Sequence, residues 1–99
     1  MRPIHDVSLD GVESVLVLTR ELVRPHLDVV TVAPIHPVGR GLSTEVAVGE
    51  RNGVGDGSVV DCDSVITISA ADLGPNRGFL FLSQEKLLSQ ALRSAFDLE

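Results

Sequence analysis

Two apolar runs in the first third of the chain lack the alternation of a half-exposed strand. Residues 14–19 and 29–33 consist mainly of β-branched and aliphatic side chains. Apolar runs of this length are typical of strands that are buried on both faces. We therefore predict that these segments form the two central strands of a sheet. Between them, Pro25 limits residues 20–28 to a loop with one helical turn.

Four shorter segments also carry strand signals. Residues 44–48 alternate between polar and apolar positions, as a half-buried strand does. Residues 58–62, 65–69 and 78–82 are short apolar runs bounded by turn residues, which favours further strands. The glycine-dense segment 49–57 predicts a surface loop.

The last part of the chain has the period of an amphipathic helix. Apolar residues recur every three or four positions, and polar residues fill the positions between them. This spacing predicts one helix that packs its apolar stripe on the sheet, with Ser83 as its N-cap. The stripe consists of Leu87, Leu88, Ala91, Leu92, Ala95 and Phe96.

Together these elements predict a mostly β fold with one C-terminal α-helix. With 99 residues, of which 43% are hydrophobic, the chain can fill one core but not two. We therefore expect a single domain over residues 1–99. Aromatic residues make up only 3% of the chain, which argues against an RNA-binding surface of stacked aromatic rings.

Charge and cysteine content restrict the partners and the compartment. The net charge of −6 disfavours long-range attraction to nucleic acid, so any such site must be local. Cys62 is the only cysteine, which excludes an internal disulfide and makes the cytoplasm the expected compartment. Asp61 and Asp63 beside it should raise the pKa of its thiol, which favours a packing role. We expect no metal site and no membrane partner, since metal-ligand spacing and membrane-length apolar runs are missing.

Five segments in a fixed order resemble the MazF/PemK toxins of bacterial toxin–antitoxin pairs. The resemblance extends over nearly the whole chain and is strongest to short actinobacterial members that begin at an Arg-Pro-Ile-His segment. The segments are Thr19-Arg20-Glu21, the run from Val30 to Ile35, the run from Arg40 to Val46, the run from Ser58 to Asp63, and Ala95-Phe96-Asp97-Leu98.

The resemblance implies an SH3-like small β-barrel of the MazF/PemK/CcdB type with a C-terminal amphipathic helix. It also implies a homodimer that acts as a metal-independent, sequence-specific endoribonuclease and needs no cofactor. Single-stranded RNA would be cleaved to 2′,3′-cyclic phosphate and 5′-hydroxyl ends. A cognate MazE-like antitoxin would neutralise the toxin by inserting an acidic segment into the RNA groove.

Two positions depart from the family pattern. Family members usually carry an Arg before the first long strand and a Thr or Ser after the Ala-Pro-Ile segment, and both serve the scissile phosphate. The matching residues here are Glu13 and His36. Both of the usual catalytic residues are therefore replaced.

The replacements still form a workable acid–base pair. RNA cleavage without a metal needs a base for the 2′-hydroxyl, an acid for the leaving 5′-oxygen and a group that stabilises charge on the phosphorane. Glu13 and His36 are candidates for base and acid, and Arg40 is the candidate for charge stabilisation. Gly39 and Gly41 beside it should let backbone N–H groups approach an anion. A solvated loop histidine between Pro34 and Pro37 is the competing interpretation of His36.

Five further residues are candidates for RNA contacts. Arg20 and Arg24 should bind phosphates that flank the scissile bond, unless they form a solvated pair neutralised by nearby acids. Thr44 matches a family position near the groove. Asp63 and Ser64 occupy the place where the family carries base-contacting residues, although simple turn residues would also fit there.

Two function classes remain open on the sequence. One is a working endoribonuclease that uses Glu13 and His36. The alternative is a catalytically impaired dimer with the toxin fold that acts as an antitoxin-binding or regulatory protein, because a Glu at a phosphate site introduces repulsion. Convergence of Glu13, His36 and Arg40 in one groove would favour the first class.

Overall fold

Seven strands and one C-terminal α-helix form the secondary structure of the computed structural model, which describes residues 1–98. Short 3-10 helices connect several of these elements. The strands are β1 (Arg2–Leu9), β2 (Val12–Val17), β3 (Val29–His36), β4 (Glu45–Val48), β5 (Ser58–Asp61), β6 (Ile66–Ser69) and β7 (Leu73–Leu80), and the helix is α1 (Glu85–Ala95).

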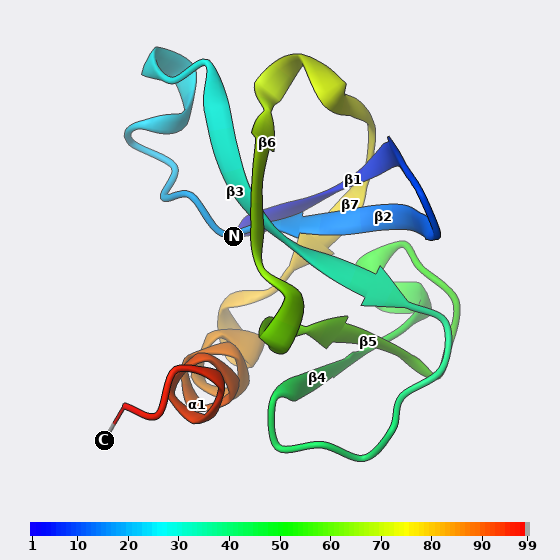
Figure 1. Ribbon diagram of the computed structural model, residues 1–99. Coiled ribbons are helices and arrows are strands. Elements are labelled where there is room, and N and C mark those ends of the chain that lie inside the picture. The colour runs from blue at the N-terminus through cyan, green and yellow to red at the C-terminus, as the bar shows by residue number, and fades with distance from the viewer. Residues whose placement is uncertain (99) are drawn as a thin grey trace.

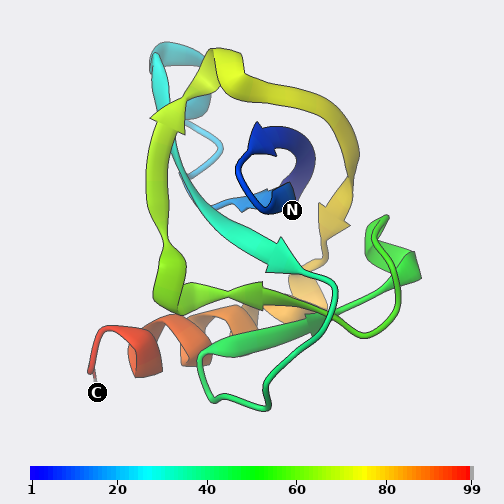
Figure 2. The ribbon, with the colours of Figure 1, turned by 45° about the vertical axis from the view of Figure 1, so that its right-hand side comes forward.

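The strands form one antiparallel sheet in the order β4-β5-β3-β2-β1-β7, with β6 also paired to β3. The sheet curls into a half-barrel (Figure 1). Helix α1 lies across one end of it, beside β4 and β5 (Figure 2). This arrangement confirms the predicted fold class, a mostly β barrel-like domain with one C-terminal helix.

Strand β3 lies in the middle of the sheet and is buried on both faces. Ala33 and Ile35 contribute to one hydrophobic cluster, and Val30 and Val32 contribute to the other. This burial explains why its sequence does not alternate, and it confirms that β2 and β3 are central. The strand runs past Pro34 to His36, because Pro34 is held opposite Val15 of β2 while Ile35 pairs with β5.

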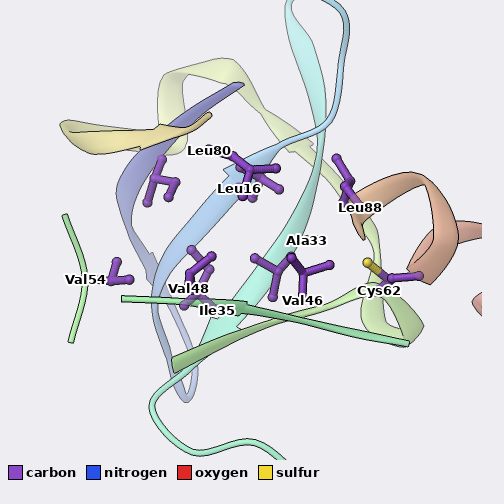
Figure 3. Close-up of a cluster of buried hydrophobic side chains, with 12 residues drawn as sticks. Leu16, Ala33, Ile35, Val46, Val48, Val54, Cys62, Leu80 and Leu88 are labelled. Carbon is purple, nitrogen blue, oxygen red and sulfur yellow. The ribbon is translucent and has the colours of Figure 1, made fainter. Parts of the chain in front are cut away.

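The larger cluster joins the sheet to the helix (Figure 3). Leu16 and Leu80 from the sheet and Leu88 from α1 have at most 1% of their surface exposed. Cys62 belongs to the same cluster, which confirms its packing role. Burial, together with the negative charges of Asp61 and Asp63, raises the pKa of the Cys62 thiol to about 11.

The sequence interpretation missed β1 and most of β7. Residues 78–82 predicted only the end of β7, which begins at Leu73 and contains Gly74 and Pro75. These turn residues hide a strand that pairs with β1 through several register shifts. Strand β1 mixes buried and half-exposed positions without regular alternation, so its pairing rather than its pattern defines it.

The glycine-dense loop is less superficial than predicted. Asn52 in the 3-10 helix η2 (Glu50–Asn52) is buried and donates to the carbonyl of Phe79 and to the side chain of Gln84. Gly53 follows with φ of 89°, and a Cβ there would collide with the carbonyl of Arg77. The loop therefore inserts its tip against β7 and fixes that strand in place.

The helix begins later than predicted, and its stripe is only partly covered. Ser83 is not the N-cap, because it lies inside the 3-10 helix η5 (Leu82–Gln84) that precedes α1. Leu88 and Ala91 are buried, whereas Leu87 and Phe96 are 50% and 57% exposed. No helix within residues 1–98 is long and apolar enough to cross a membrane.

Candidate active site

His36 is the last residue of β3 and precedes Pro37, a position that favours extended backbone. Its side chain is 35% exposed, and Nε2 lies 3.0 Å from Oδ2 of Asp61 on β5. Asp61 reaches the ring because Val59, two residues earlier on β5, is the cross-strand partner of His36. The ring is therefore half-exposed and held in place, which does not fit a solvated loop histidine.

Asp61 is a buried carboxylate surrounded by hydrogen-bond donors. Its side chain is 4% exposed and accepts from the Asp63 backbone N–H (2.9 Å) and the Ser64 hydroxyl (3.0 Å) as well as facing His36. Burial by itself raises the pKa of Asp61, but these hydrogen bonds and the charge of His36 outweigh it. The pKa of Asp61 is therefore lowered from its ordinary value of 3.8.

Three of the residues predicted to contact RNA, Thr44, Asp63 and Ser64, lie around this carboxylate. Thr44 is buried, and its hydroxyl donates to Oδ2 of Asp63 at 2.6 Å. Asp63 and Ser64 belong to the 3-10 helix η3 (Cys62–Ser64), for which Asp61 is the N-cap. The structure thus brings Thr44, Asp63, Ser64 and His36 into one network, which we call the Asp61 network.

Glu13 lies on the neighbouring strand but does not pair with His36. Ser14 of β2 pairs with Ile35 of β3, and Glu13 and His36 are the next residue on each strand. Within residues 1–98 no ion pair joins the two side chains. Glu13 is exposed and lines a surface hollow of about 850 Å³ between the β1–β2 hairpin and the tip of the glycine-rich loop. We call this the hairpin hollow.

Arg77 is the cationic residue of the hairpin hollow. It lies on β7, is half-exposed, and forms an ion pair of 3.4 Å with Asp6 on β1. Ile35 and Pro37 also line the hollow, so it borders the end of β3 that carries His36. The hollow therefore contains a carboxylate and a guanidinium and borders the strand end that carries the candidate histidine.

Arg40 is exposed on the loop between β3 and β4. Its backbone N–H donates to Glu45, whose buried carboxylate also accepts from the N–H of Leu42. The anion bound by the N–H groups beside Gly39 and Gly41 is therefore the chain's own carboxylate. The guanidinium lies 3.9 Å from Glu45 and is 65% exposed, so it is free to meet a substrate. Within residues 1–98 no hydrogen bond or ion pair joins it to Glu13 or His36.

Arg20 and Arg24 lie at the other end of β3. Arg24 begins the 3-10 helix η1 (Arg24–His26), which precedes the start of β3, whereas His36 ends that strand. Eight residues of strand separate the two ends by roughly 23 Å. The structure thus separates the two arginines from the Asp61 network (Figure 1).

Sequence and structure comparisons place this geometry in a known family. The chain is 54% identical over 99 residues to endoribonuclease MazF3 of Mycobacterium tuberculosis (strain CDC 1551 / Oshkosh). The alignment covers all of this chain and 96% of that relative. The chain belongs to the MazF family of endoribonuclease toxins. No protein-family model matches the sequence.

Solved MazF structures share the fold. The M. tuberculosis toxin MazF-mt6 aligns with a TM-score of 0.94 and 54% identity over 99% of both chains. An endoribonuclease in complex with its cognate antitoxin from a mycobacterial species aligns with a TM-score of 0.86 over 98% of this chain and 93% of that one. At 19% identity, the second match supports the fold alone.

Two residues of the candidate site, Asp61 and Arg77, were not predicted as site residues from the sequence. In the sequence, Asp61 stands near the end of a predicted strand, and its contact with His36 joins residues that are 25 positions apart in the chain. Arg77 lies in the segment between residues 69 and 78, which contains Gly74 and Pro75 and for which no strand was predicted. The only signal for Asp61 was a carboxylate at the end of an apolar strand. In residues 1–98 no group of three or more His, Cys, Asp or Glu side chains is arranged to hold a metal ion.

Proposed function

We propose that this MazF-family chain cleaves single-stranded RNA sequence-specifically and without a metal ion. The products are 2′,3′-cyclic phosphate and 5′-hydroxyl ends. The observation that carries the proposal is the half-exposed His36 ring at the end of β3, hydrogen-bonded to buried Asp61 and next to the hollow that contains Glu13. A held imidazole beside a free carboxylate is an acid–base pair.

In this proposal Glu13 is the base and His36 is the acid. The Glu13 carboxylate takes the proton of the 2′-hydroxyl, and the resulting oxygen attacks phosphorus. As the bond from phosphorus to the 5′-oxygen breaks, protonated His36 donates its proton to that oxygen. Arg40 stabilises the charge that develops on the phosphorane, since its guanidinium is exposed at the adjacent loop. Solvent then returns a proton to His36 and removes one from Glu13.

The remaining candidate residues bind the RNA strand around the scissile phosphate. Asp63 is exposed and accepts from an amino group of a base, while Thr44 fixes its carboxylate by a hydrogen bond. Ser64 supports the same site through Asp61. Arg20 and Arg24 bind phosphates at the far end of β3, where they contribute to affinity rather than to chemistry.

We further propose that the chain is a cytoplasmic homodimer that a cognate MazE-like antitoxin binds. An apolar groove of about 630 Å³ along α1 is lined by residues that include Leu88, Leu92, Phe96 and Leu98. Phe96 and Leu98 in this groove are 57% and 63% exposed. Apolar surface gathered in one place is typical of an interaction site. One of the solved relatives is described as an endoribonuclease with its cognate antitoxin.

A cleavage assay with end-group analysis tests the proposed reaction. Purified protein is incubated with a long single-stranded RNA in EDTA, and the ends are identified by their response to kinase and phosphatase. We expect cleavage in EDTA, with 5′ ends that accept phosphate directly. Loss of cleavage in EDTA with recovery in magnesium, or 5′-phosphate ends, would contradict the proposal.

A second candidate function rests on Glu13. An exposed carboxylate lining the hollow repels phosphate, so the chain would be an impaired toxin that acts by binding its antitoxin. In that case the wild-type chain does not cleave RNA, and the double variant Glu13→Arg plus His36→Thr gains activity. Cleavage by the wild-type chain excludes this candidate.

A further inference from the structure

The contact between His36 and Asp61 determines how the imidazole ring is oriented. Nε2 lies 3.0 Å from Oδ2 of Asp61, a normal hydrogen-bond length. The carboxylate is 4% exposed, whereas the ring is 35% exposed. One edge of the ring is therefore directed at a buried anion, and the rest of the ring remains accessible from outside.

Asp61 itself has little freedom to move. Oδ1 accepts from the N–H of Asp63, and Oδ2 accepts from the hydroxyl of Ser64. Its backbone pairs with Glu45 of β4, and the next N–H, that of Cys62, donates to the carbonyl of Thr44. The carboxylate is thus fixed by its own hydrogen bonds and by the strand that carries it.

The hydrogen bonds around the Asp61 carboxylate determine which nitrogen of the His36 ring carries a proton. Every partner of the Asp61 carboxylate is a donor, and the hydrogen bonds lower its pKa, so the group is ionised and only accepts. The ring nitrogen that faces it must then be Nε2–H. In the neutral ring Nδ1 is left without a proton, and in the charged ring Nδ1–H is the proton that can be transferred.

We propose that Asp61 is a positioning residue that holds His36 as the Nε2–H tautomer, so that Nδ1 is the nitrogen that meets the RNA. This inference rests on the proposed function of His36 as the general acid. Nδ1–H gives its proton to the leaving 5′-oxygen as its bond to phosphorus breaks, and the ring becomes neutral with Nε2–H still bound to Asp61. The carboxylate keeps the ring in the same orientation before and after the transfer.

The other ionisable groups near this strand end are already engaged or lie apart from the ring. Asp63 on η3 accepts from Thr44, and Glu45 on β4 is bound by N–H groups of the β3–β4 loop together with Arg40. Glu13 on β2 forms no ion pair with His36 within residues 1–98. Asp61 is therefore the group whose removal should change the ring.

The substitution Asp61→Asn tests the proposal, with Asp56→Asn as a matched control. Asp56 also accepts a backbone N–H, that of Glu50, and its replacement changes the net charge equally, but it lies outside the site. Asn can either accept or donate, so both ring tautomers should become populated. Nitrogen-15 NMR of the His36 ring should show the Nε2–H tautomer in the wild type and in Asp56→Asn, and a mixture in Asp61→Asn.

Kinetics on the same variants give a second readout. Asp61→Asn should lower kcat roughly 10- to 100-fold, less than the loss of a whole acid, with little change in KM. A loss of fold would instead lower the folded fraction and leave kcat per folded molecule unchanged.

Two results would overturn the inference. The first is an Nδ1–H tautomer of His36 in the wild-type protein, a measurement that does not require Asp61→Asn to fold. The second is a folded Asp61→Asn with the wild-type kcat. If the wild type does not cleave RNA but shows the Nε2–H tautomer, the proposed function fails, and the inference for the reaction fails with it. An Nδ1–H tautomer in a protein that cleaves RNA defeats the inference alone.

Discussion

Two carboxylates flank the end of β3, and their surroundings differ in almost every respect. Asp61, at the junction of β5 and η3, is buried and accepts hydrogen bonds from Asp63 and Ser64 while holding His36. Glu13, beside the β1–β2 hairpin, is exposed in the hairpin hollow and forms no ion pair within the described residues 1–98. A carboxylate with all its partners in place cannot easily take a proton, whereas a free one can.

This difference assigns separate tasks to the two groups. In the proposed mechanism, Asp61 contributes to the fold and to the orientation of His36, and Glu13 acts on the RNA. Substitutions at Glu13 should therefore affect cleavage but not stability, and substitutions at Asp61 should affect both. The predictions below test this separation.

The largest effect is expected for His36→Ala. Losing one general acid–base group should lower cleavage roughly 10²- to 10⁴-fold. The ring is at the end of a strand and 35% exposed, so the protein should stay folded. Single-turnover cleavage and a thermal unfolding curve measure the two quantities. A cleavage rate within a few fold of wild type would remove His36 from the mechanism.

Glu13→Gln should lower cleavage by a similar factor, roughly 10²- to 10⁴-fold, because an amide cannot take the proton of the 2′-hydroxyl. Thermal stability should be unchanged, since Glu13 is exposed and forms no ion pair within the described residues. Glu50→Gln, an exposed carboxylate on η2, is the matched control for charge. Full activity in Glu13→Gln would show that this carboxylate is not the base.

Arg40→Ala should reduce kcat more than it raises KM, because its charge acts on the phosphorane that forms in the transition state. We expect a loss of roughly 10- to 100-fold, smaller than at the acid–base pair, since the guanidinium is 65% exposed. Arg51→Ala removes another exposed cation, which lies over the ring of Phe81 away from the site, and should be nearly neutral for cleavage. A pure KM effect would limit Arg40 to binding.

Asp61→Asn should also reduce stability near neutral pH, by about 1–3 kcal/mol for unsatisfied buried donors. The sign of its pH dependence follows from the lowered pKa of Asp61. A carboxylate with a lowered native pKa stabilises the fold above 3.8 and loses that contribution as pH falls through the native pKa. The stability difference between wild type and Asp61→Asn should therefore shrink below about pH 4, as measured by urea unfolding at several pH values. A difference that persists at pH 2 would contradict this.

The smallest effect concerns Cys62. Burial and the two neighbouring aspartates raise its thiol pKa to about 11, so the native thiol should resist alkylation near neutral pH. Its contribution to stability should decline as pH rises from 9, where an unfolded thiol ionises, towards 11. Iodoacetamide labelling in native buffer and in urea measures the contrast. Rapid labelling of the folded protein would show that the site is open.

The sequence predicted the centre of the sheet better than its edges. Strands β2 and β3 are buried on both faces, so their apolar runs identify them directly. Strand β7 contains Gly74 and Pro75, and it exists because β1 pairs with it. The local sequence pattern of β7 does not indicate that it pairs with β1, a strand far away in the chain. The helix was predicted correctly, but its N-terminus was not, because η5 precedes it.

The site shows the same limit. The sequence identified His36 from its place after Ala33-Pro34-Ile35 and took Glu13 as its partner. The hydrogen-bond partner is Asp61, which only the pairing of β3 with β5 brings near. The chain carries no acidic residue from Val29 to Thr44, but the carboxylates of Asp61 and Glu45 approach this stretch in space.

The division of labour between Glu13 and His36 is tested most directly with an RNA whose scissile 5′-oxygen is replaced by sulfur. A thiolate is a better leaving group than an alkoxide and needs no proton, since thiols ionise near pH 8.5. We predict that this substrate restores cleavage to His36→Ala and leaves Glu13→Gln as defective as before. Restoration of Glu13→Gln, or no restoration of His36→Ala, would contradict the assignment of base and acid.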